Sequence, residues 1–215
     1  MQSDKTVLFD WNGTLLDDAE LAVSVMNEIL RSENMKEVIV DFYREVFDFP
    51  VINYYQVLGF DTEEKWQTAS KRFVAGYVAR MNTLHLFDGV KEGLQKLKDA
   101  GFRLGIVSAM EHSMLLKHTD FYGLHSFVSH IQGIENTEGH GKLHLAEKVQ
   151  KEWKLIPENT WYVGDTTHDR DFSHALGSRI VLKSGGHNSC ERLEKSGEVV
   201  VTSFDDLISL IELQN

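Results

Sequence analysis

The chain has 215 residues, 42% of them hydrophobic, which suits one large domain or a domain with an insertion. Its formal net charge of -11 argues against broad nucleic-acid binding, because no basic run offsets it. The single cysteine excludes an intramolecular disulfide, and no apolar run approaches the ~20 residues that span a membrane. An apolar strand begins by residue 6, so we expect no signal peptide, no membrane partner and a cytoplasmic location.

The first segment with a chemical signature is a short apolar strand over residues 6–9 that ends in the carboxylate of Asp10. Asn12 and Gly13 follow, so the chain turns sharply beside that carboxylate. An Asn-Gly turn is also a hairpin signal, but the apolar residues from Ala22 to Leu30 repeat at helical spacing. We therefore expect a strand, a turn, and a helix capped by Asp17. Backbone amides in the turn suit an anion next to a nucleophilic oxygen.

Residues 17–84 show helical periodicity and no convincing strand. One helix is expected near residues 36–47, a short apolar segment over 51–58, and a long helix capped by Thr62. The long helix carries an apolar stripe that favours helix–helix packing over contact with a substrate. Its members are Trp66, Ala69, Phe73, Tyr77 and Met81. We expect a small helical bundle inserted after the first strand.

Strands and helices alternate after residue 85, which predicts an α/β fold with a parallel sheet covered on both faces. Strands are expected over residues 102–107, 127–131, 161–163, 179–182 and 199–201. Helices are expected after Asp88 and over 111–118, 142–153 and 205–213. The domain assignment is a Rossmann-like three-layer core of residues 1–16 and 85–215, with residues 17–84 as an inserted helical unit. Such sheets bind ligands at the carboxyl ends of their strands.

Three further polar segments fall where that edge is expected. Ser108 ends the strand over 102–107, although a serine there is often only a turn residue. Lys142 opens a helix after a glycine, without the other residues of a P-loop, and an isolated lysine on a helix is usually solvated. Asp165 and Asp169 follow an apolar strand, and two carboxylates so spaced can flank a hard cation.

Together these segments resemble the four motifs of the haloacid dehalogenase-like hydrolases, in order and with a cap-sized insertion after the first. The first family motif is Asp-x-Asp-Gly-Thr, and here Asn12 replaces the second Asp. The chain is similar to the phosphoglycolate phosphatase-like branch, whose members carry a helical cap.

The resemblance implies that Asp10 is a nucleophile forming an aspartyl-phosphate, that Ser108 binds a phosphoryl oxygen, and that Lys142 balances phosphate charge. It implies Mg²⁺ held by Asp10, the backbone carbonyl of Asn12, and Asp165, with Asp169 assisting directly or through water. The remaining expected substrate-binding positions are Trp11, Gly13, Thr14 and Ala109.

The function expected from this resemblance is magnesium-dependent hydrolysis of a small phosphorylated metabolite. Two alternatives stay open: phosphorus–carbon cleavage, as in phosphonoacetaldehyde hydrolases, and a phosphate-binding regulatory protein with weak turnover. The first would need a cap lysine, for which Lys36, Lys65 and Lys71 are available. Asn12 cannot give or take a proton, so we expect a preference for acidic leaving groups such as aryl phosphates, acyl phosphates or diphosphates.

Overall fold

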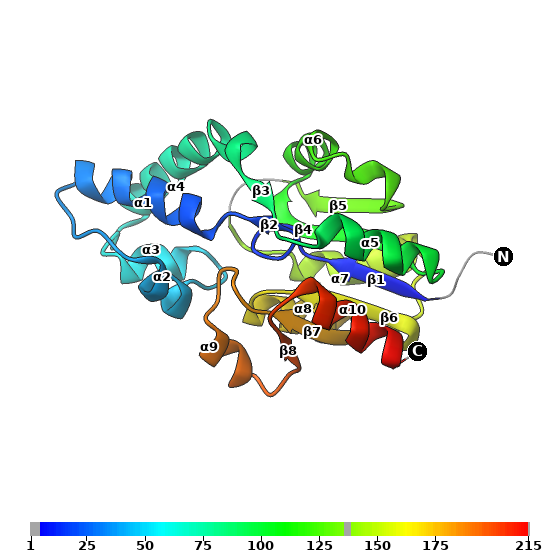
Figure 1. Ribbon diagram of the computed structural model, residues 1–215. Coiled ribbons are helices and arrows are strands. Elements are labelled where there is room, and N and C mark those ends of the chain that lie inside the picture. Colours follow the sequence, from blue (N-terminus) through cyan, green and yellow to red (C-terminus); the bar gives the residue numbers. More distant parts are fainter. Residues whose placement is uncertain (1–4, 136–138, 215) are drawn as a thin grey trace.

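The computed structural model describes residues 5–135 and 139–214. Its centre is a six-stranded sheet in the order β5-β4-β1-β6-β7-β8, in which every neighbouring pair is parallel (Figure 1). The strands are β1 (Thr6–Phe9), β4 (Arg103–Glu111), β5 (His130–Ile134), β6 (Thr160–Gly164), β7 (Arg179–Lys183) and β8 (Val200–Val201). The central position of β1 brings the residue after Phe9 to the middle of the sheet's carboxyl edge.

Helices cover both faces of this sheet, because alternate residues of the buried strands point to opposite sides. Val7 and Phe9 of β1 pack against one cluster, whereas Leu8 belongs to the other. The first face is covered by α5 (Val90–Asp99), α6 (His112–Phe121) and α10 (Phe204–Leu213). The second is covered by α7 (Ala146–Glu152), α8 (Thr167–Leu176) and the short α9 (Cys190–Glu194). The predicted Rossmann-like three-layer α/β fold is confirmed.

Four helices lie together at one end of the sheet (Figure 1). They are α1 (Ala19–Ser32), α2 (Val40–Val46), α3 (Ile52–Val57) and α4 (Glu63–Val78). They share a hydrophobic cluster of their own, in which Ala69 of α4 is buried and Trp66 and Phe73 pack at its margin. The α4 stripe thus packs in part against the other helices, but Trp66, Phe73 and Tyr77 also line the cavity described below. Two short antiparallel strands, β2 (Leu16–Asp17) and β3 (His85–Leu86), join the four helices to the sheet.

Several element boundaries differ from the sequence prediction. Asp17 lies in β2 and Asp18 precedes α1, so Asp17 is not the helix cap. The strand expected over 127–131 begins at His130, because the preceding apolar residue Val128 packs in the core from an irregular segment. The helix expected over 142–153 begins as a 3₁₀ turn at Leu143, and the helix expected over 36–47 is only α2. Among the described residues, no helix is long and apolar enough to cross a membrane.

Candidate active site

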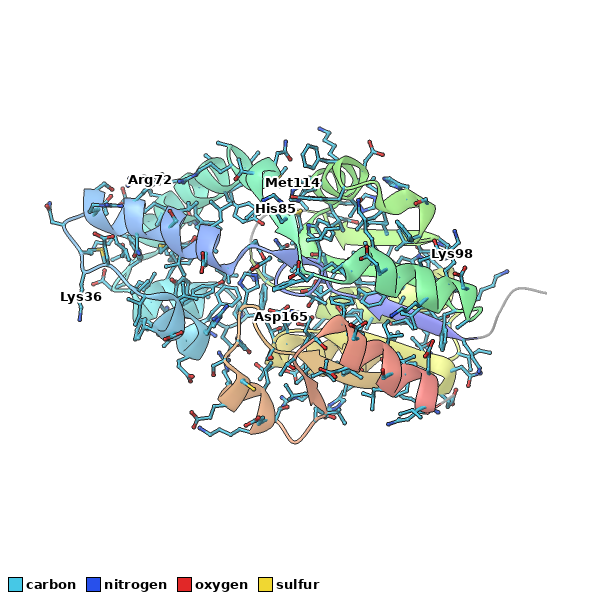
Figure 2. All side chains as sticks on the ribbon, in the orientation of Figure 1. Lys36, Arg72, His85, Lys98, Met114 and Asp165 are labelled. Carbon is cyan, nitrogen blue, oxygen red and sulfur yellow. The ribbon has the colours of Figure 1, made fainter. Side chains whose placement is uncertain are left out.

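The carboxyl edge of the sheet opens into a cavity of about 220 Å³ that reaches the helices α2 and α4. Asp10, Ser108 and Ala109 line it from the sheet side, and Tyr43 and Tyr77 line it from the helices. Figure 2 shows Asp165 at the point where the sheet meets the helical part. With Asn12, four of the sequence-predicted residues thus share one cavity with side chains from a segment that the motifs did not include.

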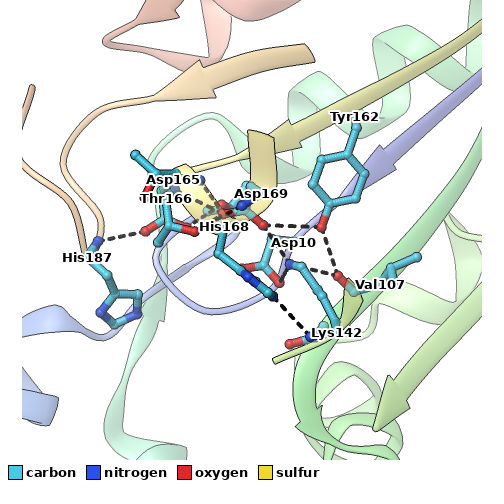
Figure 3. Close-up of polar contacts among 12 residues, drawn as sticks. Asp10, Val107, Lys142, Tyr162, Asp165, Thr166, His168, Asp169 and His187 are labelled. Carbon is cyan, nitrogen blue, oxygen red and sulfur yellow. Dashed lines mark hydrogen bonds and ion pairs between the residues drawn. The ribbon is translucent and has the colours of Figure 1, made fainter. Parts of the chain in front are cut away.

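The buried ammonium of Lys142 is the centre of the charged cluster (Figure 3). Its Nζ lies 2.7 Å from Oδ1 of Asp10 and 2.6 Å from Oδ1 of Asp169, with the side chain only 1% exposed. It also donates to the carbonyl of Val107 at 3.3 Å. Burial opposes the charge, but Asp10 and Asp169 raise the pKa of Lys142 above its ordinary value. The lysine is therefore a fixed cation beside Asp10 rather than a solvated surface group.

His168 holds the backbone of Lys142 in place, a role that the sequence did not reveal. The amide of Lys142 donates to Nε2 of His168 at 3.0 Å. The imidazole must therefore accept at Nε2, which requires its neutral form. Burial, followed by the nearby Lys142 charge, lowers the pKa of His168 to about 4. The ring of Phe49 lies 4.5 Å from the imidazole, centroid to centroid, and closes this side of the site.

Asp169 is held on both carboxylate oxygens. Oδ2 accepts from the amides of Asp165 and Thr166 and from the Thr166 hydroxyl, as part of a capping box at the start of α8. Oδ1 meets Lys142 and accepts from the Tyr162 hydroxyl at 3.3 Å. These contacts explain why the pKa of Asp169 is lowered even though burial alone would raise it.

Asp10, Asp165 and Asp169 bring carboxylate oxygens within 4.8 Å of one another. Thr14 donates its hydroxyl to Oδ1 of Asp165 at 2.7 Å, and the His187 amide donates to Oδ2 at 2.6 Å. Burial raises the pKa of Asp10 to about 7 against the opposing charge of Lys142, and raises that of Asp165 to about 6. Three buried carboxylates facing one ammonium leave an excess of negative charge, which a hard divalent cation would balance.

Asn12 is tied to a second carboxylate. Its Nδ2 donates to Oδ2 of Asp18 and to the Tyr77 hydroxyl, both at 2.8 Å. Tyr77 donates to the same Asp18 oxygen at 2.7 Å, and Oδ1 of Asp18 lies 3.1 Å from Nε2 of His187. With both amide hydrogens of Asn12 in use, only its carbonyl oxygen is left for another partner. The sequence contained no signal for this network, because Tyr77 and His187 lie far along the chain from Asn12 and Asp18.

Three expected substrate-binding positions have other partners. Trp11 is fully buried in the core, where its indole donates to His118, so its side chain does not reach the cavity. The Thr14 hydroxyl donates its hydrogen to Asp165. The Gly13 amide donates to Asp18 at 2.8 Å and to the Leu16 carbonyl, so it is not available to an anion. The glycine itself is required, because φ is +71° and a Cβ would meet Asp165 at 2.2 Å.

The neutral imidazole of His168 predicts a loss of stability in acid. The pKa of His168 is about 4 in the fold and about 6.5 in an unfolded chain, so unfolding takes up a proton below pH 6.5. The contribution of neutral His168 to the free energy of unfolding is thus fully present above pH 6.5 and is lost as the pH falls toward 4. Between pH 7.5 and pH 5 we expect His168 to contribute about 2 kcal/mol to this loss.

Urea unfolding at the two pH values measures the effect. In His168→Gln the side-chain oxygen replaces Nε2 as acceptor without titrating, so the variant should lose less stability on acidification than the parent. An equal loss in both proteins would contradict the assignment.

Comparisons with known proteins agree with this geometry. The chain is 26% identical over 205 residues to the tyrosine-protein kinase PtkA of Mycobacterium tuberculosis, covering 94% of this chain and 69% of PtkA. It is 25% identical over 218 residues to the pyrophosphatase PpaX of Bacillus mycoides, covering 98% of each. The crystal structure of a putative phosphoglycolate phosphatase from Lactobacillus delbrueckii shares the fold, with a TM-score of 0.82, 18% identity and coverage of 98% and 99%. A family profile matches residues 7–183, and the chain therefore belongs to the haloacid dehalogenase-like hydrolases.

Proposed function

We propose that this protein is a magnesium-dependent phosphatase that hydrolyses a small phosphorylated substrate through an aspartyl-phosphate on Asp10. The main support is the position of Asp10, which lines the cavity while its carboxylate contacts the buried ammonium of Lys142 at 2.7 Å. A carboxylate in this place can attack phosphorus, and the ammonium offsets the repulsion between two anions. Relatives named phosphatase or pyrophosphatase support the same class of reaction.

The chemistry has two steps. An Asp10 oxygen forms a bond to phosphorus, and the bond from phosphorus to the substrate oxygen breaks. Water then attacks the aspartyl-phosphate, which releases phosphate and restores Asp10. Ser108 lines the cavity, and its hydroxyl oxygen accepts a hydrogen bond from the Met110 amide. The hydroxyl hydrogen of Ser108 therefore remains available to donate to a phosphoryl oxygen.

The buried carboxylates fit a Mg²⁺ ion. Asp10 and Asp165 would hold it together with the backbone carbonyl of Asn12, and it would supply positive charge that neutralises the phosphate. Asp169 fits a supporting role better than a direct one, because both of its oxygens already accept from protein donors. Its ion pair with Lys142 orients the ammonium toward Asp10.

The helices α1 to α4 would act as the cap, over residues 17–84. They supply Tyr43 and Tyr77 to the cavity, opposite Asp10 and Ser108. The two short strands β2 and β3 are the connections through which this unit joins the sheet. A substrate held between the two parts would be shielded from water during transfer.

Phosphorus–carbon cleavage has no support in this cavity. That reaction needs an amine in the cap, and Lys36, Lys65 and Lys71 are all exposed and outside the cavity lining. Figure 2 shows Lys36 at the outer end of the helical part, far from Asp165.

Slow turnover is the second candidate, and Asn12 is the observation that favours it. Without a titratable group at this position, the aspartyl-phosphate would lack the base that activates water. The protein would then hold phosphate on Asp10, as a binding protein or a phosphoryl donor. Magnesium-dependent phosphate release from a panel of esters, with intact mass to detect phosphorylated protein, separates hydrolysis from retention.

Asp10→Asn should abolish turnover, because the amide nitrogen and oxygen of asparagine are poor nucleophiles. The neutral side chain keeps nearly the same shape, so folding should be retained and can be checked by thermal unfolding. Residual activity above about one hundredth would indicate an acid–base role, which typically contributes ~10²–10⁴ in rate.

Asp165→Asn should weaken magnesium binding and turnover together. Calorimetric titration with Mg²⁺ measures binding directly, independent of activity. Asp171→Asn, which removes an exposed carboxylate paired with Arg170, is the matched control and should bind the ion as the parent does. Unchanged binding in Asp165→Asn would remove this residue from the metal site.

Asn12→Asp should restore acid–base help only if Asp18 is changed as well. An aspartate here would place a carboxylate about where the amide nitrogen now lies, 2.8 Å from Oδ2 of Asp18. The double variant Asn12→Asp with Asp18→Asn keeps a donor–acceptor pair between the two positions, with its direction reversed.

We expect the double variant to raise the rate on an alkyl phosphate at least about tenfold more than on an aryl phosphate, since poor leaving groups need the proton most. Asp18→Asn alone is the control. An equal rise on both substrates would contradict this account of Asn12.

A further inference from the structure

The far end of the cavity, beyond Asp10, is apolar and aromatic. Its lining from the helical part includes Phe47, Tyr54, Trp66, Phe73 and Tyr77, and Met110 and Met114 lie on the other side. An apolar cavity of about 150 Å³ is enough to bind benzene, so about 220 Å³ accommodates a substituted aromatic ring. Rings on the walls offer edge-to-face contacts to such a group.

No lysine or arginine lines this cavity among the described residues, and residues 1–4, 136–138 and 215 include neither type. Besides Asp10, the carboxylates Asp18 and Glu111 are in the lining. A substrate with a carboxylate or a second phosphate in its leaving group would therefore bring an uncompensated charge into a site of low polarity. Burying such a charge without a partner is strongly unfavourable.

Among the described lining residues, His187 is the one cationic side chain that could offset this charge. Burial opposes its protonation, but Asp18 raises its pKa to about 9, and the two groups are already paired. Nε2 lies 3.1 Å from Asp18, and Nδ1 lies 2.7 Å from the Tyr43 hydroxyl. Both ring nitrogens therefore have protein partners. Lys142 lies between Asp10 and Asp169 at the phosphoryl end and is not part of the lining. Among the described residues, Lys142 and His187 are thus both paired with carboxylates of the protein.

One polar group at the apolar end, the hydroxyl of Tyr54, is neutral. Tyr54 is buried and lines the cavity, and its hydroxyl has no hydrogen-bond partner among the described residues. The hydroxyl oxygen is itself buried, and a neutral hydroxyl does not balance a full negative charge.

We propose that the substrate is a phosphate monoester of an uncharged aromatic hydroxyl compound, without a carboxylate or a second phosphate. The inference rests on the proposed phosphatase function and narrows its substrate class. Asn12 points to the same class independently, because a phenolate departs without the proton that an alkoxide requires. The charge of the cavity narrows the leaving groups expected from Asn12, because a diphosphate such as pyrophosphate carries a second anionic group into the cavity and should be poor. Phosphoglycolate should be poor for the same reason.

Two non-hydrolysable ligands test the class without requiring turnover. Benzylphosphonate and phosphonoacetate carry the same phosphonomethyl group and differ in having a phenyl ring or a carboxylate. In calorimetric titrations with Mg²⁺ present, we expect benzylphosphonate to bind at least about tenfold more tightly. Equal binding, tighter binding of phosphonoacetate, or no binding of benzylphosphonate would overturn the proposal.

Kinetics with phenyl phosphate, phosphoglycolate and pyrophosphate distinguish this inference from the function on which it rests. Phenyl phosphate should give the highest kcat/KM. If none of a wider panel of esters releases phosphate, the phosphatase function fails, and the two phosphonates still decide the ligand class.

Ser70→Lys supplies the missing cation. Ser70 is a half-buried residue of α4 in the cavity lining, so a lysine there should shift the binding ratio at least about tenfold toward phosphonoacetate. Thr68→Lys adds the same charge two residues away, at an exposed position outside the lining, and should leave the ratio unchanged. An equal shift in both variants would mean that net charge, not the cavity, sets the preference.

Discussion

The buried ion pair between Lys142 and two carboxylates is the interaction on which the site depends. A lysine that is 1% exposed is stable only because Asp10 and Asp169 face it at 2.7 and 2.6 Å. The same contacts hold Asp10 at the cavity while its neighbours keep an excess of negative charge. Several core features serve this cluster: the His168 ring fixes the lysine backbone, and the Thr166 cap fixes Asp169. The cost of burying these charges is thus offset by many short contacts.

The family motif has an Asp where this chain has Asn12, and here a different carboxylate, that of Asp18, lies beside this position. Asp18 accepts from the side chain of Asn12 and the amide of Gly13, and it also contacts Tyr77 and His187. Both carboxylate oxygens of Asp18 accept hydrogen bonds, so Asp18 is a fixed anion rather than a proton donor. Burial opposes its charge, but His187 and the hydrogen bonds lower its pKa. Because Tyr77 and Tyr43 belong to the four-helix part, the network also fixes how that part meets the sheet.

The sequence was sufficient for the order of strands and helices and for the edge at which polar residues gather, because apolar periodicity and strand-end carboxylates are local signals. The same local signals did not show where each side chain lies. Trp11 follows Asp10 directly, yet its indole is buried in the core, whereas Asp10 lines the cavity. Thr14 and Gly13 looked available to an anion, but their partners come from Asp165 and Asp18.

His187 and Tyr77 could not be predicted at all, since neither stands in a motif and each reaches the site only through the fold. Thr166 and His168, which lie between Asp165 and Asp169, were missed residues with a positional signal.

The charged residues of the site lie at one end of the cavity and the aromatic residues at the other. This separation follows from where each strand and helix ends. The charged residues lie at the carboxyl ends of the strands. Backbone N–H groups there, including those at the N-terminus of α8, can donate hydrogen bonds to carboxylates. The helices α2 to α4 turn aromatic side chains toward the same space, because those residues also form the helices' own core. One set of rings therefore serves both to hold the helices together and to line the cavity. An uncharged ring of a substrate would pack against these aromatic side chains, whereas an anionic group would bury an unpaired charge among them.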